Sequence, residues 1–325
     1  MGGNHTQPIF ILLGMTDTPW AQAPLFGLFL LIYGVTLVGN MGLVVLVWVA
    51  PSLHTPMYFF LTHLSLADIC YSTVISPKML TNLISGNKTI SWAGCVTQFH
   101  LFALFATAEC HLLAAMAYDR HVAVCHPLRY VTVMSPRACW QLVALSYLVA
   151  SLSALLYTGC TFGGSFCGPH RVDHFFCDAG PVLRLACSDT RGREAAIFGL
   201  ATANGLGTSV AILLSYCRVL HAVLGMRSAP GRARAFHTCA SHLVSVSVFY
   251  GTLFFMYLQP ASRHGGRDKV VSVFYTVVSP VLNPFIYSLR NKEVKAALGK
   301  CRRRVLNLCW CQRGAGHGIR EPWNG

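Results

Sequence analysis

Long apolar segments constrain the fold of this 325-residue chain more than any other feature. A helix that spans a bilayer needs about 20 mostly apolar residues. Only 11% of the residues are charged, against about 25% in a soluble domain. We therefore expect an all-α membrane protein with a seven-transmembrane helix bundle. The expected spans are residues 24–49, 57–82, 96–122, 139–159, 195–222, 236–258 and 270–289.

The distribution of positive charge predicts the orientation of the bundle. If residue 1 lies outside, 16 of the 25 Lys and Arg residues are cytoplasmic, eight are outside and Lys78 lies within a span. Cytoplasmic loops carry such an excess, so the net charge of +14 does not indicate a nucleic-acid partner. We expect residues 1–23 outside the cell, the spanning domain over 24–289 and a cytoplasmic tail over 290–325, in a multi-pass protein of the plasma membrane.

Two glycosylation acceptors agree with this orientation. Asn4 begins the triplet Asn-His-Thr and Asn87 begins Asn-Lys-Thr. Such triplets are modified only after translocation across the membrane. We expect a glycan on Asn4 and a less efficient reaction at Asn87, whose loop is short and close to the membrane.

One connection, residues 160–194, is long and rich in cysteine. A loop of this length in a compact domain needs internal order, and an oxidising exterior allows disulfides to supply it. Two bridges among five outer cysteines can be drawn in many ways, so the residues alone leave the pairing open. The outer cysteines are Cys95, Cys160, Cys167, Cys177 and Cys187.

An acid and a base stand side by side where the third span should leave the membrane. Asp119 and Arg120 close the run Met116-Ala-Tyr-Asp-Arg120, and His126-Pro-Leu-Arg-Tyr130 follows. Charged side chains at such a position are costly and are usually functional. The alternative is an Arg that simply extends its head group to the membrane surface.

Further motifs follow in order on the other spans. They are Gly39-Asn40, Pro56-Met-Tyr-Phe-Phe-Leu61, Leu64-Ser-Leu-Ala-Asp68, Trp140, Ser215-Tyr216, Phe236-His-Thr-Cys-Ala-Ser-His242 and Pro280-Val-Leu-Asn-Pro-Phe-Ile-Tyr287. With the Asp119-Arg120 segment, they resemble the olfactory (odorant) receptors of class II (tetrapod-type), in the rhodopsin-like G-protein-coupled receptor superfamily. The resemblance covers nearly the whole chain. It departs at His121, where the family usually has Tyr, at His237 for Ser and at Arg234 for Lys.

The resemblance implies a pairing for four of the cysteines. Cys95 would bridge to Cys177, and Cys167 would bridge to Cys187. Cys160 would then remain unpaired at the membrane edge. The alternative is that some of these residues are buried free thiols.

The resemblance also implies an activation switch at the cytoplasmic side. Arg120 would pair with Asp119 at rest and would turn toward Tyr216 and a G protein on activation. A proline inside a helix removes a donor and kinks it, so Pro284 would bend the seventh span. The switch and G-protein coupling residues are Asp119, Arg120, Tyr216, His242, Asn283, Pro284 and Tyr287.

Two acids, Asp68 and Glu109, fall in the middle of expected spans. Neighbouring carboxylates cannot both remain charged at low cost. The resemblance implies a sodium ion beside Asn40 and Asn283. Two protonated, hydrogen-bonded acids without a metal are the alternative, and no other cofactor is expected.

Faces of the outer helical halves predict the ligand pocket. These halves carry no charged residue suited to an amine, so we expect a small, neutral, volatile odorant in an apolar pocket with a few hydroxyl and amide groups. Each side chain could also serve packing alone. The pocket residues are Phe102, Ala106, Thr107, Cys110, Leu200, Asn204, Tyr250, Leu253, Tyr257, Val273 and Thr276.

The resulting hypothesis is an odorant receptor that activates a stimulatory (olfactory-type) G protein and raises cyclic AMP. After the seventh span, basic residues indicate a short cytoplasmic amphipathic helix on membrane lipid. One alternative is a non-olfactory chemoreceptor for a metabolite. A transporter would require inverted repeats, which the chain lacks, and no nucleophile–base pair or metal triad in the sequence indicates an enzyme.

Overall fold

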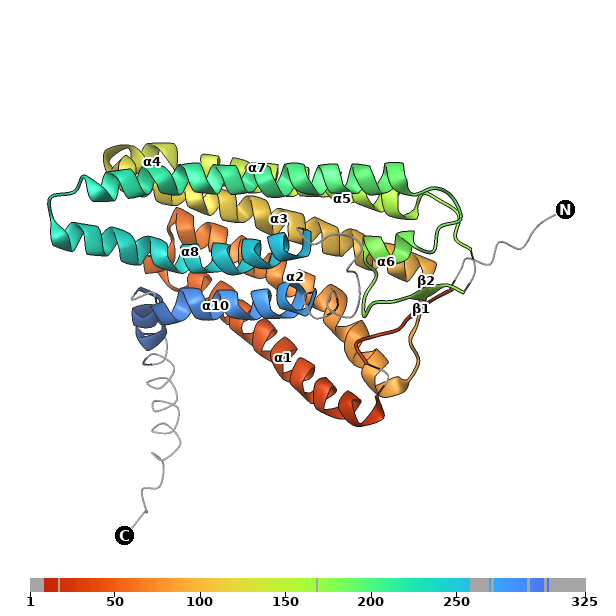
Figure 1. Cartoon of the computed structure of the whole chain (residues 1–325). Coiled ribbons are helices and arrows are strands. Elements are labelled where there is room, and N and C mark those ends of the chain that lie inside the picture. The colour runs from red at the N-terminus through yellow and green to blue at the C-terminus, as the bar shows by residue number, and fades with distance from the viewer. Residues whose placement is uncertain are drawn as a thin grey trace, which may run out of the picture.

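Long helices lying side by side make up most of the structure, a computed structural model (Figure 1). It describes residues 9–16, 18–167, 169–257, 269, 272–290, 293–300 and 303. The helices that form the bundle are α1 (Pro19–Val49), α2 (Pro56–Ser85), α3 (Trp92–Cys125), α5 (Pro136–Phe162), α7 (Arg191–Leu224), α8 (Ala229–Tyr257) and α10 (Ser279–Arg290).

Shorter elements lie at the two ends of the bundle. Strands β1 (Ile9–Leu12), β2 (Thr89–Ser91) and β3 (Arg171–Val172) and helix α6 (Ala179–Leu183) lie at one end, called the strand end here (Figure 1). Helix α4 (Tyr130–Val133) lies at the opposite end, called the α4 end. Single turns form at η1 (Pro51–Leu53) and η2 (Pro127–Arg129), and a π-helical turn, η4 (Phe274–Val278), leads into α10.

Five helices of the described chain are long and apolar enough to cross a membrane: α1, α2, α3, α5 and α7. Two shorter apolar stretches, His242–Phe254 and Phe274–Ile286, lie within the last two segments expected from the sequence. Leu31 and Trp48 of α1 are 65% and 80% exposed. Large exposed apolar surfaces are rare in soluble monomers, whereas hydrocarbon accommodates them.

Most helices extend past the apolar segments expected from the sequence, and two of them begin at a polar cap. The Ser91 side chain accepts a hydrogen bond from Gly94 N at the start of α3, and Ser135 caps α5 in the same way. Gly86 ends α2 at φ 65°, in the left-handed region that glycine enters without a Cβ penalty. Helix α8 begins at Ala229, ahead of the expected residue 236, because the amphipathic turn before the span is helical too.

The three strands tie distant segments together at the strand end. β1 pairs antiparallel with β2, with Phe10 opposite Ile90, and parallel with β3, with Leu12 opposite Val172. The long 160–194 connection, expected from sequence to need order, is thus held by the N-terminal strand. Phe10, Leu12 and Val172 are fully buried beside Cys95.

Helix α1 is fastened to α10 where a proline interrupts the backbone ladder. Pro284 has no N–H, so the carbonyl of Pro280 lacks its usual partner four residues on. Asn40 Nδ2 donates to Pro280 O at 3.0 Å instead. A Cβ on Gly39 would lie 3.0 Å from Pro284 Cγ, so the glycine permits this close approach.

Replacing Asn40 should therefore destabilise the α1–α10 joint. In Asn40→Ala the carbonyl of Pro280 stays buried and unpaired, at a cost of about 1–3 kcal/mol. We expect a lower thermal unfolding midpoint for purified receptor in sodium-free buffer. Asn82→Ala is the matched control, because Asn82 is also buried but its amide has no hydrogen-bond partner. Equal losses in the two variants would contradict the argument.

Candidate functional site

The acid–base pair predicted from the sequence forms at the α4 end. Arg120 Nε donates to Asp119 Oδ2 at 2.9 Å, and Arg120 Nη2 contacts the same oxygen. Sequence reasoning missed a third member: Tyr130 donates its hydroxyl to Asp119 Oδ1 at 2.8 Å. Both carboxylate oxygens are thus occupied, and burial together with the Asp119 charge raises the pKa of Tyr130. Tyr130 is the last residue of the segment His126-Pro-Leu-Arg-Tyr130 quoted above, and this position shortly after Asp119 was the signal that the sequence offered.

A histidine couples α8 to α3 and α7. His242 Nδ1 lies 2.6 Å from Tyr216 Oη, and His242 Nε2 lies 3.1 Å from the carbonyl oxygen of Leu113. A carbonyl can only accept, so Nε2 donates to it and Nδ1 accepts the Tyr216 proton. One neutral imidazole therefore joins three helices, and two of the predicted switch residues, Tyr216 and His242, are in contact.

The two mid-membrane acids meet around one amide. Asn283 Nδ2 donates to Asp68 Oδ2 at 3.0 Å and to Glu109 Oε1 at 3.5 Å. Asp68 Oδ1 and Asn40 Oδ1 are buried without a hydrogen-bond partner. Oxygen ligands of this kind suit a hard cation. The side chains present therefore fit the sodium ion that the sequence suggested.

The remaining switch residues are only partly described. Asn283 is buried, and Pro284 lies inside α10. The side chain of Tyr287 lies outside the described part of the structure, as does that of Tyr257.

Predicted pocket residues near the strand end join an aromatic cluster. Phe102 has its ring centroid 5.1 Å from that of Phe176 and 6.2 Å from that of Tyr275. Ala106 and Val273 pack against the same cluster. Phe175, Phe176 and Tyr275 were not predicted as pocket residues. For Phe175 and Phe176 the sequence did offer a signal, because they directly precede Cys177, which is tied to α3.

A second group of predicted pocket residues meets deeper in the bundle. Tyr250 donates its hydroxyl to Thr208 Oγ1 at 2.7 Å and to the carbonyl of Cys110 at 3.4 Å. Leu253 packs against the same core cluster. Thr208 was not predicted, although it lies one turn beyond Asn204 on the same face of α7.

The other predicted pocket residues face different neighbours. Asn204 Nδ2 donates to Ser153 Oγ at 3.2 Å and to Leu200 O at 2.9 Å, so it joins α7 to α5. Thr276 is buried and donates to Ser272 O at 2.6 Å. Thr107 is buried in α3. The structure therefore splits the predicted set into an aromatic group, a deeper hydroxyl group and a link to α5.

Two disulfides fix the long connection over the bundle. Cys95 is bonded to Cys177 and Cys167 to Cys187, the pairing that the resemblance implied, and Cys160 is free. Gln98, which sequence reasoning missed, accepts from Cys177 N at 3.0 Å and donates to Val74 O at 3.0 Å. The connection is thus held both covalently and by a buried amide.

His174 packs within this connection and contacts the last apolar segment. Its ring stacks on Phe175 with centroids 4.6 Å apart, and Nε2 lies 3.1 Å from Ser272 Oγ. Burial, and then the charge of Lys269, lowers the pKa of His174 to about 3. Lys269 itself pairs with Asp173 at 2.6 Å.

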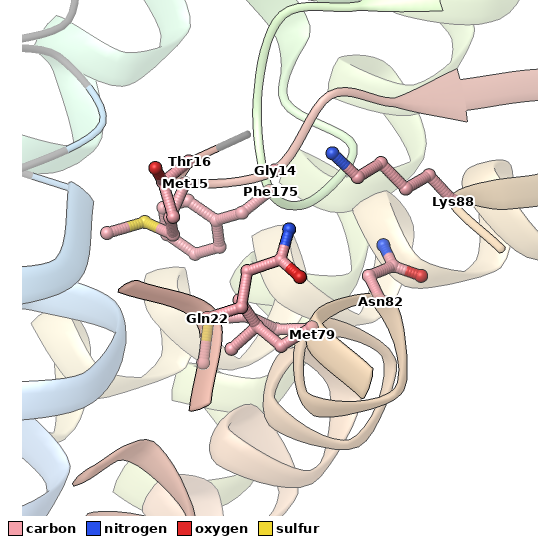
Figure 2. A pocket seen from close by; sticks show the side chains of 9 residues that line it. Gly14, Met15, Thr16, Gln22, Met79, Asn82, Lys88 and Phe175 are labelled. Atoms are coloured by element: carbon pink, nitrogen blue, oxygen red, sulfur yellow. The ribbon is translucent and has the colours of Figure 1, made fainter. Parts of the chain in front are cut away.

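A small cavity lies beside this connection (Figure 2). Its volume of about 10 Å³ is close to one water molecule. The side chains of Asn82 and Lys88 lie near each other at its rim, and Lys88 Nζ donates to Leu13 O at 3.1 Å. It is too small for an odorant.

Of the two glycosylation acceptors, one lies within the described residues. Asn87 is exposed, and its Oδ1 accepts from Thr89 Oγ1 at 2.7 Å. Asn4 lies outside the described part. Modification of either residue remains a prediction.

The arrangement of helices is that of a rhodopsin-like receptor. A solved crystal structure of squid rhodopsin matches 94% of this chain and 94% of its own, with a TM-score of 0.72 and 18% sequence identity. At that identity the likeness establishes the fold.

The sequence comparisons define the family. The olfactory receptor family profile matches residues 29–304. Olfactory receptor 8U3 of Mus musculus is 53% identical over 90% of this chain and 92% of its own length, and that of Homo sapiens is 52% identical over 90% of each. Olfactory receptor 5B21 of Mus musculus is 52% identical over 91% and 93%. The chain belongs to the olfactory receptor family: it is a multi-pass membrane odorant receptor and not an enzyme.

Acidification should loosen the connection around His174. The pKa of His174 in the folded protein, about 3, lies below the ordinary 6.5. The contribution of the neutral, buried His174 to the free energy of unfolding is therefore complete above about pH 6.5 and is lost as the pH falls toward 3. Between about pH 7.5 and pH 5 the loss should be about 2 kcal/mol. His174→Gln, which does not titrate, should lack this part of the pH dependence of stability. Thermal unfolding and hydrogen exchange of residues 171–177 measure it; identical pH profiles for both proteins would refute it.

Proposed function

We propose that the chain crosses the membrane seven times, with the strand end outside the cell and the α4 end in the cytosol. Two disulfides lie at the strand end, as an oxidising exterior favours. The exposed acceptor Asn87 lies at the same end. Helix α4 and the start of α8 lie opposite, where Arg129, Arg137, Arg227 and Arg232 add positive charge.

The ligand is a small, neutral, volatile odorant bound beneath the disulfide-linked connection. The observation that carries this proposal is the hydroxyl contact of Tyr250 with Thr208 and Cys110 O. The single hydroxyl proton goes to Thr208 Oγ1 or, over the longer distance, to Cys110 O, so this group links α8 to α7 and lies against α3. Among the described residues of the two pocket groups none is charged, so a neutral guest with one polar atom is the complementary ligand.

Odorant binding would reach the cytoplasmic side through α8. Tyr250 lies two turns of that helix from His242, which bonds to Tyr216 and to Leu113 O. A ligand that takes over the Tyr250 hydroxyl changes the packing of α8 on α3 and α7. The population then shifts toward a state in which α8 moves outward and the His242 contacts break.

The partner is a heterotrimeric stimulatory (olfactory-type) G protein, and the product of signalling is cyclic AMP. Release of Arg120 from Asp119 frees a guanidinium with several donors at the cytoplasmic surface. Leu128 and Val131, on either side of the Tyr130 that contacts Asp119, are 100% and 82% exposed. Exposed apolar side chains around a charged centre form a suitable docking surface.

A sodium ion between Asp68, Glu109 and Asn40 would stabilise the resting arrangement. Its single positive charge offsets one of the two negative charges that the buried carboxyl groups would carry if both were ionised. Asp68 Oδ1 and Asn40 Oδ1 are the oxygen atoms free to hold it, and Asn283 orients both acids. Protonation of the two acids is the competing solution.

The segment after α10 lies on the inner membrane surface as a short amphipathic helix. Residues 293–300 are helical, and Val294 and Ala297 are buried in the main core cluster. Tyr58 donates its hydroxyl to Glu293 Oε2 at 2.9 Å, which fixes the segment to α2. Lys295 and Lys300 are exposed, as binding to anionic lipid requires.

Removing the Tyr250 hydroxyl should change ligand recognition. We expect Tyr250→Phe to shift the half-maximal concentration of responsive odorants by about tenfold, equivalent to 1.4 kcal/mol, because the ring remains but the hydrogen bonds are lost. A panel of neutral volatile odorants, read by cyclic AMP in transfected cells, measures it. Tyr118→Phe, on the exposed side of α3, is the control. Unchanged dose curves and ligand ranking would place the pocket elsewhere.

Loss of the Tyr130 hydroxyl should raise activity without odorant. The hydrogen bond to a charged acceptor contributes about 1.5–3 kcal/mol to the resting state. Tyr130→Phe should therefore raise basal cyclic AMP several-fold at equal surface expression. Arg120→Ala should abolish the odorant response. A basal level in Tyr130→Phe equal to that of wild type would show that this contact does not restrain the receptor.

A further inference from the structure

A groove at the α4 end serves none of the functions described above. It lies between the ends of α3 and α7 and has a volume of about 540 Å³. Mostly apolar atoms line it. The lining residues that matter here are His121, His126, Leu214, Cys217, Arg218 and His221.

A buried histidine in this lining lacks a polar partner. His121 is only 7% exposed, and its Nδ1 has no hydrogen-bond partner. The His126 ring is the neighbour on the groove side, with centroids 5.6 Å apart. A buried unpaired nitrogen costs about 1–3 kcal/mol, so a polar ligand atom in the groove would relieve it.

The charge of the groove is of one sign. Arg218 and His221 are exposed on α7, and His126 is exposed at the end of α3. The described lining contains no acid, and the sequence has none between Glu194 and Asp268. Asp119, the nearest acid on α3, is already bound by Arg120 and Tyr130. The groove therefore complements an anion.

The surface beside the groove is apolar. Leu213, Leu214 and Leu220 of α7 are 62%, 58% and 57% exposed, so this side of the helix faces hydrocarbon. An apolar wall beside exposed Arg218 is the arrangement found where acyl chains meet head groups, and the cytoplasmic leaflet is rich in anionic lipid. A soluble anion would satisfy only the basic part of the groove.

We propose that the groove binds one anionic phospholipid of the inner leaflet. The phosphate contacts Arg218 and His126, a polar head-group atom reaches His121, and an acyl chain lies along Leu214 and Cys217. This assignment rests on the proposed orientation of the receptor.

The bound lipid would join two helix ends next to the switch. Cys125 Sγ already contacts Arg218 O at 3.5 Å, and His121 directly follows Arg120. A ligand across the groove therefore holds α3 against α7 close to the Asp119–Arg120 pair.

Thiol protection tests the proposal on purified full-length receptor in detergent micelles. Cys217 is exposed and free, so N-ethylmaleimide labels it, and peptide mass spectrometry measures the rate. Added phosphatidylserine should slow labelling of Cys217 at least several-fold, whereas phosphatidylcholine should not. Cys160, at the strand end, should label equally with both lipids.

Matched variants identify the anion contact. Arg218→Gln should abolish the protection by phosphatidylserine, whereas Arg227→Gln, also exposed but outside the groove, should retain it. Equal protection by the two lipids, equal effects of the two variants, or protection by glycerol phosphate alone would each overturn the proposal. The assay uses neither odorant nor G protein, so its failure is distinct from a failure of cyclic AMP signalling.

Discussion

A bilayer offers no water to unpaired backbone groups, so protein must satisfy each of them. Pro284 breaks the ladder of α10, and the amide of Asn40 replaces the missing donor to Pro280 O. This one hydrogen bond holds α1 against the turn of α10 that Pro284 interrupts, with Gly39 allowing the approach. Asn283, directly before Pro284, donates to both Asp68 and Glu109. The buried polar centre of the receptor thus depends on a side-chain hydrogen bond that replaces a missing backbone hydrogen bond in α10.

The two ends of the bundle differ in how they are held. At the strand end, two disulfides, a three-stranded sheet and the buried Gln98 amide fix the long connection. At the α4 end, the contacts that join the helices are single noncovalent bonds, such as Tyr216 with His242. Such bonds contribute about 1 kcal/mol each and can be exchanged. A rigid strand end and an adjustable α4 end suit a protein that reports binding across a membrane.

The proposed ligand contact and the charged pair lie in different parts of the bundle. The Tyr250–Thr208 contact lies among apolar side chains, whereas the charged pair lies at the α4 end. A neutral ligand can therefore act on α8 without meeting a strong charge. The inner-leaflet groove beside Arg218 would add the lipid as a second ligand near the same switch, on the face of α3 next to Arg120.

The sequence by itself determined the apolar spans and the adjacent Asp119-Arg120 pair, because both are local properties of the chain; its resemblance to a known family supplied the disulfide partners. Only the tertiary structure decided which distant groups meet. The contacts of Tyr130 with Asp119, of Gln98 with Cys177 and of Asn204 with Ser153 were not predicted. A helical face tells which way a side chain points, but its partner depends on how neighbouring helices are rotated and shifted. Helix packing sets those variables, and several rotations bury nearly the same apolar area.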